Sequence, residues 1–316
     1  MSTPPPAAEQ AEGTGPAPPG AAARRPAAGS LLATGPWLGG VLVLIVGVVF
    51  FPAGYMIFNA TRDISAFGVD RGSVGFDNFA RVWTLPALPR VLLNSAVWVI
   101  GVVVLTVLIS LALAQFLNKA FPGRRWVRLA VIVPWAASVV MTSTVFYYGF
   151  DPFYGIINRA LVDIGVLDVP FGFTKQPVPA FAVAMGVAVF VSLPFTTYTL
   201  LAGLQTIPDD VLEAARIDGA GRFATYRLVV LPMLRPAIAV ATLINIINVF
   251  NSLPILRIIA GSIPGYDADT TTTLIFKLIQ TERQVDTASA LSVVNFALVV
   301  VITLIYLRIA RPMREE

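Results

Sequence analysis

Six long stretches without a charged side chain limit what this sequence can fold into. Each is rich in Val, Leu, Ile and Ala, with scattered Gly and Pro. A helix of about 21 residues extends about 31 Å, which matches a bilayer hydrocarbon core of about 30 Å. The pattern therefore predicts six transmembrane helices, over residues 38–58, 92–117, 129–150, 179–203, 236–256 and 287–307.

The composition agrees with membrane helices and excludes several kinds of chemistry. Hydrophobic residues make up 56% of the 316 residues and charged residues only 13%, whereas soluble domains carry about 25% charged residues. Since Cys and His are both absent, disulfides, thiolate metal sites and histidine-based catalysis are excluded. We therefore expect an all-α fold, a polytopic membrane protein.

The N-terminal segment and two short basic segments predict the orientation of the chain. Residues 1–30 are rich in Ala, Pro and Gly, which predicts a disordered cytoplasmic tail. A transmembrane domain over 31–316 follows, with its core at about 88–309. Lys and Arg concentrate in residues 118–128 and 308–316, and the positive-inside rule then places both termini in the cytoplasm. The net charge of +4 is attributed to this topology and to anionic lipid, not to nucleic acid.

One polar segment between two predicted spans, residues 204–236, carries helix signals. A proline followed by two aspartates at 208–210 is typical of a helix start, because carboxylates complement the positive end of the helix. Gly219 can adopt a positive φ and end that helix. A second short helix is expected over 222–230, with a turn at Pro232. The segment thus predicts a cytoplasmic helix–turn–helix loop.

The residue order in this segment resembles the EAA loop of type I ABC importer permeases (ABC, ATP-binding cassette). In that loop Glu-Ala-Ala is followed by three residues, Gly and later Leu-Pro. The matching positions are Glu213, Ala214, Ala215, Asp218, Gly219, Ala220, Leu231, Pro232 and Pro236. The resemblance implies that the loop docks onto a cytoplasmic ATPase and transmits its motion. The alternative is a solvated hairpin that only joins two spans.

The resemblance covers about residues 31–312 and extends to the carbohydrate-uptake branch of the family. Segments 249–255, 270–277 and 288–292 are similar to the first permease subunit of maltose-type systems. One departure is the outer loop at 260–264, which reads Ala-Gly-Ser-Ile-Pro where the family has a Thr-Gly-Gly-Gly-Pro-like sequence. The implied partners are a second permease subunit in a heterodimer, two ATP-binding subunits, an extracytoplasmic solute-binding protein, membrane lipid and a sugar.

No motif for ATP hydrolysis occurs in the chain. Its three lysines, Lys119, Lys175 and Lys277, precede Ala, Gln and Leu, so the Gly-Lys-Ser/Thr of a phosphate-binding loop is missing. We therefore expect neither a cofactor nor an enzymatic activity in this chain. ATP and Mg²⁺ would be bound by the partner ATPase.

The predicted spans contain neutral polar side chains but no Asp, Glu, Lys or Arg. Asn245, Asn248 and Ser252 are spaced to share one face of the fifth span, with Asn251 close by. Amides and hydroxyls exchange hydrogen bonds with sugar hydroxyls, so these four residues are candidates for the substrate pathway. Hydrogen bonds between helices explain them equally well.

Other polar and aromatic side chains in the spans are assigned to packing. The amides of Asn94, Gln115 and Asn295 are isolated and favour interhelical hydrogen bonds. Trp98 is assigned to an interfacial aromatic belt.

The sequence therefore predicts a permease subunit of an ATP-driven importer of a sugar or oligosaccharide in the cytoplasmic (inner) membrane. Import of a polyol, a glycerophosphodiester or another solute by the same machinery is an alternative. An ion-coupled secondary transporter is a different class, but it needs a buried carboxylate, and none is expected here. A membrane scaffold without transport would leave the 213–236 segment unexplained.

Overall fold

The computed structural model describes residues 39–310, so the predicted tail over 1–30 lies outside the described residues. The chain divides after Ala53 into two compact units. The helical run Gly39–Asn59 is long and apolar enough to cross a membrane. It includes the π-helical turn η1 (Val46–Phe50) and α2 (Phe51–Asn59).

The described chain is mostly helical and has four to six candidate membrane spans. Besides Gly39–Asn59, three helices are each long and apolar enough to span: α4 (Leu88–Asn118), α8 (Pro177–Gln205) and α15 (Val285–Ala310). Two bent pairs add the remaining candidates: α5 (Arg124–Ala136) with α6 (Val139–Gly149), and Arg222–Met233 with α12 (Arg235–Phe250). The helical, polytopic class is confirmed, whereas six continuous helices are not.

Two predicted spans are interrupted in the structure. The third is bent by 97° between α5 and α6, because Ala137 and Ser138 have extended backbones with ψ of 145° and 134°. The fifth ends as α12 at Phe250, and a separate helix, α13 (Leu253–Ile259), follows. Hydropathy does not register such breaks, because one or two residues with extended backbones leave the mean hydropathy unchanged.

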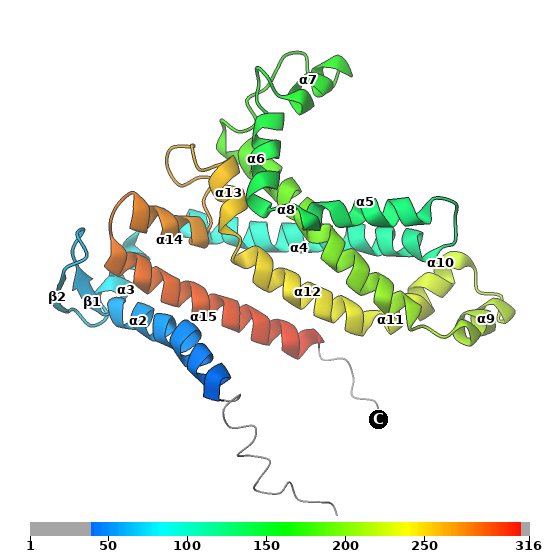
Figure 1. Ribbon diagram of the computed structural model, residues 1–316, viewed down its shortest axis with the longest axis horizontal. Coiled ribbons are helices and arrows are strands. Elements are labelled where there is room, and N and C mark those ends of the chain that lie inside the picture. The colour runs from blue at the N-terminus through cyan, green and yellow to red at the C-terminus, as the bar shows by residue number, and fades with distance from the viewer. Residues whose placement is uncertain (1–38, 311–316) are drawn as a thin grey trace, which may run out of the picture. The chain divides into compact units, whose positions relative to one another are not determined.

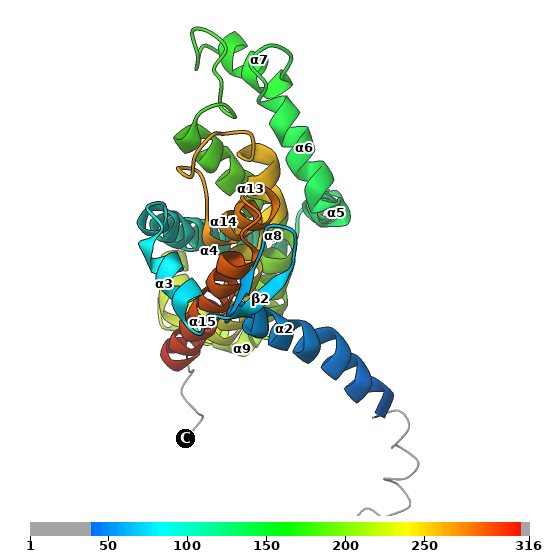
Figure 2. The same cartoon turned by 90° about the vertical axis from the view of Figure 1, so that its left-hand side faces the viewer.

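The connections between spans contain structure of their own. The antiparallel strands β1 (Arg62–Ile64) and β2 (Asp70–Ser73) pair with Arg62 opposite Ser73, a small departure from the all-α prediction. Three short helices complete these connections: α3 (Asp77–Thr84), α7 (Ile156–Asp163) and α14 (Thr271–Gln280). Figure 2 shows α6 carrying α7 away from α4 and α15.

The core of the second unit forms where α4, α8 and α12 pack together (Figure 1). Along α4 and α8 the contacts advance in step, so the two helices run in the same direction. The Trp98 ring lies edge-on to Phe181 with centroids 5.6 Å apart, and Ser110 Oγ donates to the Leu193 carbonyl over 3.5 Å. Trp98 is only 1% exposed and donates to the Val249 carbonyl over 2.9 Å. Its assignment to an interfacial belt is therefore wrong.

Candidate functional site

The segment between α8 and α12 begins with the nine-residue helix α9 (Asp209–Ile217), which has two exposed aspartates in its first turn. Pro208 precedes it with an extended backbone (φ −62°, ψ 141°). The helix is terminated by Gly219, whose φ of +79° is a conformation that glycine adopts without strain. The Gly219 amide donates to the Arg216 carbonyl, and the Ala220 amide reaches five residues back, both over 3.0 Å. This pattern is the Schellman motif, so the predicted helix and its glycine stop are present.

A second helical stretch follows over Arg222–Met233. The predicted turn at Pro232 is wrong, because the helix continues through the proline and bends, by 65°, only before α12. A proline removes one backbone donor, and a π-helical turn is a local adjustment that accommodates such a loss. The stretch consists of α10 (Arg222–Thr225), the π-helical turn η2 (Tyr226–Val230) and α11 (Leu231–Met233).

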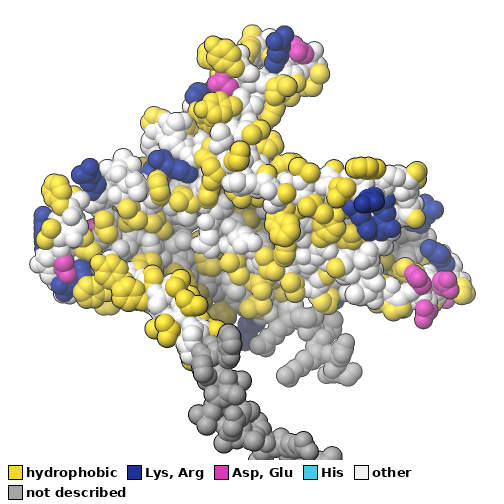
Figure 3. Space-filling model, viewed as in Figure 1, with side chains coloured by type: hydrophobic (Ala, Val, Ile, Leu, Met, Phe, Trp, Pro, Cys, Tyr) yellow, Lys and Arg dark blue, Asp and Glu magenta, His cyan; other side chains and the backbone are white. Residues whose placement is uncertain are grey.

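The loop residues singled out from the sequence fall into two groups. Exposed are Glu213, Ala214, Asp218 and Gly219, and half-buried are Ala215, Ala220, Leu231 and Pro232. Three large apolar side chains on the same loop are also exposed: Ile217 by 86%, Phe223 by 76% and Leu228 by 70%. The sequence reasoning missed these three, although bulky apolar residues in an otherwise polar loop are their signal. Figure 3 shows acidic side chains over α9 and basic side chains over the neighbouring α5 and α10.

The loop is anchored to the ends of the spans. Ile207 and Val230 are buried together with Leu204 at the end of α8 and Leu234 at the start of α12. Leu212 of α9 packs partly buried against this cluster. A displacement of α9 would therefore be passed to the ends of α8 and α12 through packed side chains.

The polar residues predicted in the fifth span line a pocket of about 390 Å³ beside α8, α12 and α13. Asn245, Asn248 and Ser252 all contribute, although Ser252 lies beyond the end of α12. Ser192 of α8, which the sequence reasoning missed, adds a second hydroxyl, and Trp135 is among the apolar lining residues. Within the described residues no charged side chain lines this pocket. It offers neutral donors and acceptors to a ligand.

The four candidate pathway residues differ in what their side chains contact. Asn245 is buried and its Nδ2 donates to Thr196 Oγ1 of α8 over 2.7 Å, which is an interhelical bond. Asn251 is exposed, and its Nδ2 donates over 2.9 Å to the Ile247 carbonyl of its own helix. Asn251 does not line the pocket. The structure therefore brings Asn245 and Asn248 to the pocket with Ser252 and leaves Asn251 outside it.

The isolated amides also separate into different environments. Asn94 bonds not to another span but to the carbonyls of Asp267 and Asp269, over 2.9 and 3.0 Å. Gln115 forms a hydrogen bond with Tyr226 of η2. Asn295 is buried, and its Oδ1 has no hydrogen-bond partner among residues 39–310. Within the described chain, the Asn295 oxygen therefore does not form the predicted interhelical hydrogen bond.

Two carboxylates are buried near the ends of helices, contrary to the expectation of none. Asp269 is 6% exposed and lies 2.6 Å from Lys277 Nζ. Asp286, in the first turn of α15, is 5% exposed and lies 3.1 Å from the Arg81 guanidinium. Both lie outside the stretches predicted as spans, Asp286 directly before the sixth span and Asp269 in the connection that precedes it, so the sequence pattern did not register them. Each is paired with a cation, so neither is a free ion ligand.

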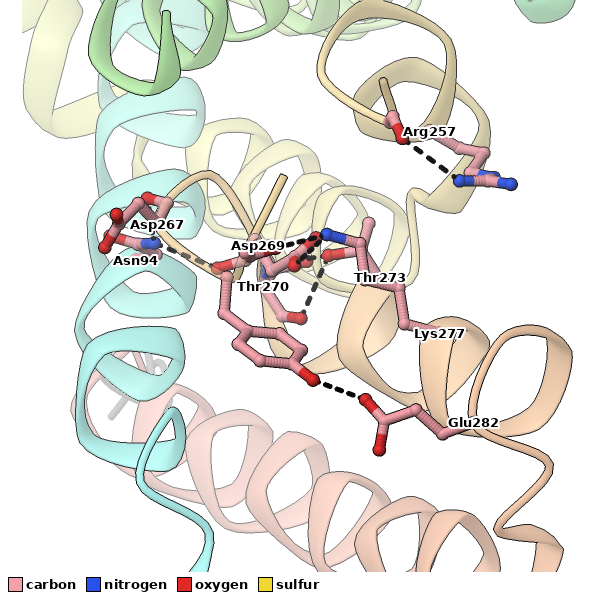
Figure 4. Close-up of polar contacts among 11 residues, drawn as sticks. Asn94, Arg257, Asp267, Asp269, Thr270, Thr273, Lys277 and Glu282 are labelled. Carbon is pink, nitrogen blue, oxygen red and sulfur yellow. Dashed lines mark hydrogen bonds and ion pairs between the residues drawn. The ribbon is translucent and has the colours of Figure 1, made fainter. Parts of the chain in front are cut away.

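A strap of chain, residues 261–270, joins α13 to α14 and includes most of the departure from the family sequence at 260–264. Figure 4 shows Asn94 of α4 and Lys277 of α14 reaching it from opposite sides. At its far end Thr270 and Thr273 form a capping box at the start of α14. The strap is therefore held by α4 and α14 together.

An additional polar contact on this strap involves Tyr266. Its hydroxyl donates a hydrogen bond to the Glu282 carboxylate just beyond α14 (Figure 4). The carboxylate beside the phenol, together with partial burial, raises the pKa of Tyr266 to about 12. The phenol therefore stays protonated, as a donor, throughout the physiological range.

The exposed loop, the neutral polar pocket and the helical spans together define a membrane permease. The family model described as "Binding-protein-dependent transport system inner membrane component" matches residues 106–314, which is more than half of the chain. The chain belongs to this family, the permease components of ABC importers. The matched region contains both the loop and the pocket.

Curated relatives agree with this assignment. A probable ABC transporter permease protein of Brucella suis is 33% identical over 269 residues, covering 85% of this chain and 93% of the relative. The trehalose/maltose transport system permease protein MalF of Thermococcus litoralis is 30% identical over 273 residues, covering 86% and 91%.

A solved structure shares the fold. The crystal structure of a bacterial alginate ABC transporter, in complex with an alginate pentasaccharide-bound periplasmic protein, matches with a TM-score of 0.77. The match covers 90% of this chain and 95% of the matched chain at 22% identity.

Proposed function

We propose that the chain is the first of two permease subunits of an importer that moves a sugar or oligosaccharide across the cytoplasmic membrane. The observation that carries the proposal is the exposed surface of the loop over 204–236. Glu213 and Asp218 are exposed on this loop, and so are the apolar side chains of Ile217, Phe223 and Leu228.

This surface supports docking to an ATPase subunit. Contiguous exposed apolar side chains with a polar rim are typical of protein interaction sites. The loop packs against the ends of α8 and α12, so a partner that moves it would act on the pocket between these helices. Since no phosphate-binding loop occurs in the sequence, ATP and Mg²⁺ belong to that partner in this proposal.

The pocket beside α12 supports a neutral, hydroxyl-rich cargo. Amides and hydroxyls from Asn245, Asn248, Ser192 and Ser252 can both donate to and accept from a sugar. A glycerophosphodiester would carry its negative charge into a pocket with no cation among its described lining residues, which is costly. A sugar or polyol is therefore favoured over a phosphodiester. The trehalose/maltose system to which one relative belongs is consistent with a sugar.

The proposed assembly also includes a second permease in a heterodimer, two ATP-binding subunits and an extracytoplasmic solute-binding protein. The family description names a binding protein, and the alginate transporter was solved with one. In this proposal both termini of the chain are cytoplasmic, with residues 118–128 and 204–236 on the same side.

Co-purification tests the assembly, and uptake tests the energy source. An affinity-tagged full chain should bring down an ATPase and a second permease, and uptake in proteoliposomes should require ATP. Uptake driven by an ion gradient without ATP would instead establish a secondary transporter. In that case Asp269 and Asp286 would be the buried carboxylates to examine as ion-coupling groups. A thermal-shift screen of the co-purified binding protein against sugars and polyols would identify the cargo.

A further inference from the structure

A pocket of about 830 Å³ lies between the end of α4 and the helices α9, α10 and α11. It shares no lining residue with the polar pocket beside α12. One of its walls is a single face of α4, formed by Leu108, Leu111, Ala112, Gln115 and Lys119. The opposite wall comes from the loop helices and includes Arg216 and Arg222.

The α4 wall changes from apolar to cationic along its length. Leu108 and Leu111 come first, Gln115 follows one turn later, and Lys119 caps the end of the helix. From Leu108 to Lys119 the helix rises about 16 Å, close to the half-thickness of about 15 Å of a bilayer hydrocarbon core. Leu108 is 58% exposed, so its side chain is available to a ligand or to lipid.

Three cationic side chains are among the lining residues of this pocket. Lys119, Arg216 and Arg222 are all exposed, and none of their side chains forms an ion pair or hydrogen bond with a residue in 39–310. No carboxylate is among the described lining residues. By contrast, Arg124 in the nearby basic segment donates a hydrogen bond to the Leu117 carbonyl at the end of α4 over 2.7 Å, so its guanidinium already has a partner.

We propose that this pocket binds one anionic glycerophospholipid. Its phosphate lies among Lys119, Arg216 and Arg222, and an acyl chain runs along Leu111 and Leu108 of α4. The three unpaired cations complement the phosphate, and each contributes to the attraction. A free phosphate would use the cations but would leave the apolar part of the α4 wall, Leu108, Leu111 and Ala112, uncovered. This part of the wall therefore favours a lipid.

The proposed lipid would touch α4, α9 and α10 at the same time. Its headgroup would join the end of a membrane span to both helices of the loop, so the position of the loop would depend on the lipid composition. The inference does not rest on the identity of the cargo, because the pocket lies apart from the cargo pocket.

Native mass spectrometry of the purified full chain, alone and with its co-purified subunits, tests this proposal. Phosphatidylglycerol and phosphatidylcholine with identical acyl chains are titrated at matched concentrations, and inorganic phosphate is added as a competitor. We expect one phosphatidylglycerol to be retained in preference to phosphatidylcholine and to resist millimolar phosphate. Lys119→Gln and Arg222→Gln should each weaken its affinity about fivefold.

Two further variants separate the lipid from simple charge effects. Ala112→Trp fills the apolar wall without changing any charge, and it should also reduce phosphatidylglycerol binding. Arg125→Gln removes an exposed cation from the same basic segment, outside the pocket, and should leave the affinity unchanged within about twofold. The Ala112→Trp result carries the test if a charge variant fails to fold.

Four outcomes would overturn the proposal. The first is equal retention of phosphatidylglycerol and phosphatidylcholine, and the second is a loss of phosphatidylglycerol affinity in Arg125→Gln as large as in the pocket variants. The third is displacement of the lipid by inorganic phosphate together with unchanged lipid binding by Ala112→Trp. The fourth is lipid binding to the isolated chain that disappears in the assembled complex. The last outcome would assign the pocket to a partner subunit.

Discussion

Asn248 and Asn251 are three residues apart, but their side chains have different surroundings. Asn248 is exposed within the pocket beside α12, and no hydrogen bond within residues 39–310 occupies its amide. Asn251 lies outside the pocket and bonds to a carbonyl of its own helix. Substitution of each residue in turn therefore distinguishes the loss of a contact with the ligand from the general effect of removing an amide.

We expect Asn248→Leu to weaken interaction with the cargo and Asn251→Leu to leave it unchanged. If the Asn248 amide bonds to the cargo, its loss leaves a polar group of the ligand unpaired at a cost of about 1–3 kcal/mol. That cost corresponds to about a five- to 150-fold weaker interaction. Uptake by reconstituted complexes at matched subunit levels measures it. Similar behaviour of the two variants would remove Asn248 from the pathway.

Gly219 and Gly221 provide a second matched pair on the loop. Gly219 has a φ of +79°, whereas Gly221 precedes α10 with a φ of −64°, which any residue adopts. Neither glycine has an atom within 4 Å of the place of a Cβ, so space does not distinguish them. Only backbone strain does.

Gly219→Asp should abolish uptake while the protein still reaches the membrane, because the left-handed backbone costs a residue with a Cβ about 1–2 kcal/mol and reshapes the loop. Gly221→Asp adds the same charge at a position where aspartate is a favoured helix cap, and should keep uptake. Membrane-fraction immunoblots and ATP-driven uptake are the measurements. Normal uptake by the Gly219 variant would mean that the loop is only a connector.

At the scale of single residues, the sequence predicts a side chain's environment only where local geometry decides it. The positive φ of Gly219 and the common pocket of Asn245 and Asn248 follow from turn chemistry and helical spacing. Trp98 does not follow, because its indole N–H is satisfied by a carbonyl on α12, far along the sequence. The exposure of Phe223 likewise depends on which neighbours the tertiary fold supplies.

At the scale of the helices, the sequence predicts where apolar segments lie but not where they bend. Proline alone is a poor guide. Pro194 is buried inside the continuous helix α8, and Pro134 lies inside α5, three residues before the bend at Ala137. Whether a helix bends at a proline depends on whether neighbouring helices and local adjustments provide new hydrogen-bond partners for the freed backbone groups. These partners are a property of the packed structure.

The contact of α8 with the start of α12 depends on the absence of a side chain at Gly203. A Cβ there would lie 2.6 Å from the Ala237 Cβ and 3.2 Å from Leu234 Cδ2. Gly203→Ala should therefore force the two helices apart and destabilise the protein by about 1–3 kcal/mol. Gly186→Ala in the same helix meets nothing within 4 Å and should be neutral or slightly stabilising. Thermal unfolding in detergent measures both, and equal melting temperatures would contradict the close approach.

At the scale of the whole chain, segments predicted to be cytoplasmic gather at one end of the second unit. The ends of α4 and α8 share a buried cluster with the start of α12. The Tyr306 hydroxyl, near the end of α15, donates to the Ala239 carbonyl of α12 over 3.1 Å. These contacts bring the ends of the helices next to residues 118–128, 204–236 and 308–310 toward one end of the second unit, which agrees with the prediction from the basic residues that they face the same side.

Cysteine labelling tests which side that is. The sequence contains no cysteine, so a single introduced thiol is the only one present. Ala120 and Ser262 are both exposed and lie in segments predicted to face opposite sides of the membrane. In intact cells an impermeant thiol reagent should label Ser262→Cys and not Ala120→Cys, and permeabilised cells should allow both. Labelling of Ala120→Cys in intact cells would invert the topology.

The parallel packing of α4 and α8 imposes an order on biogenesis. Two neighbours that run the same way cannot enter the bilayer as a hairpin, so the chain between them must cross before α8 can reach α4. During synthesis the interface of α4 with α8 is therefore uncovered until α8 emerges, including the hydroxyls of Thr106 and Ser110 that become buried in the folded protein. A nascent chain halted before α8 should consequently remain associated with the insertion machinery, and its release should coincide with the emergence of α8.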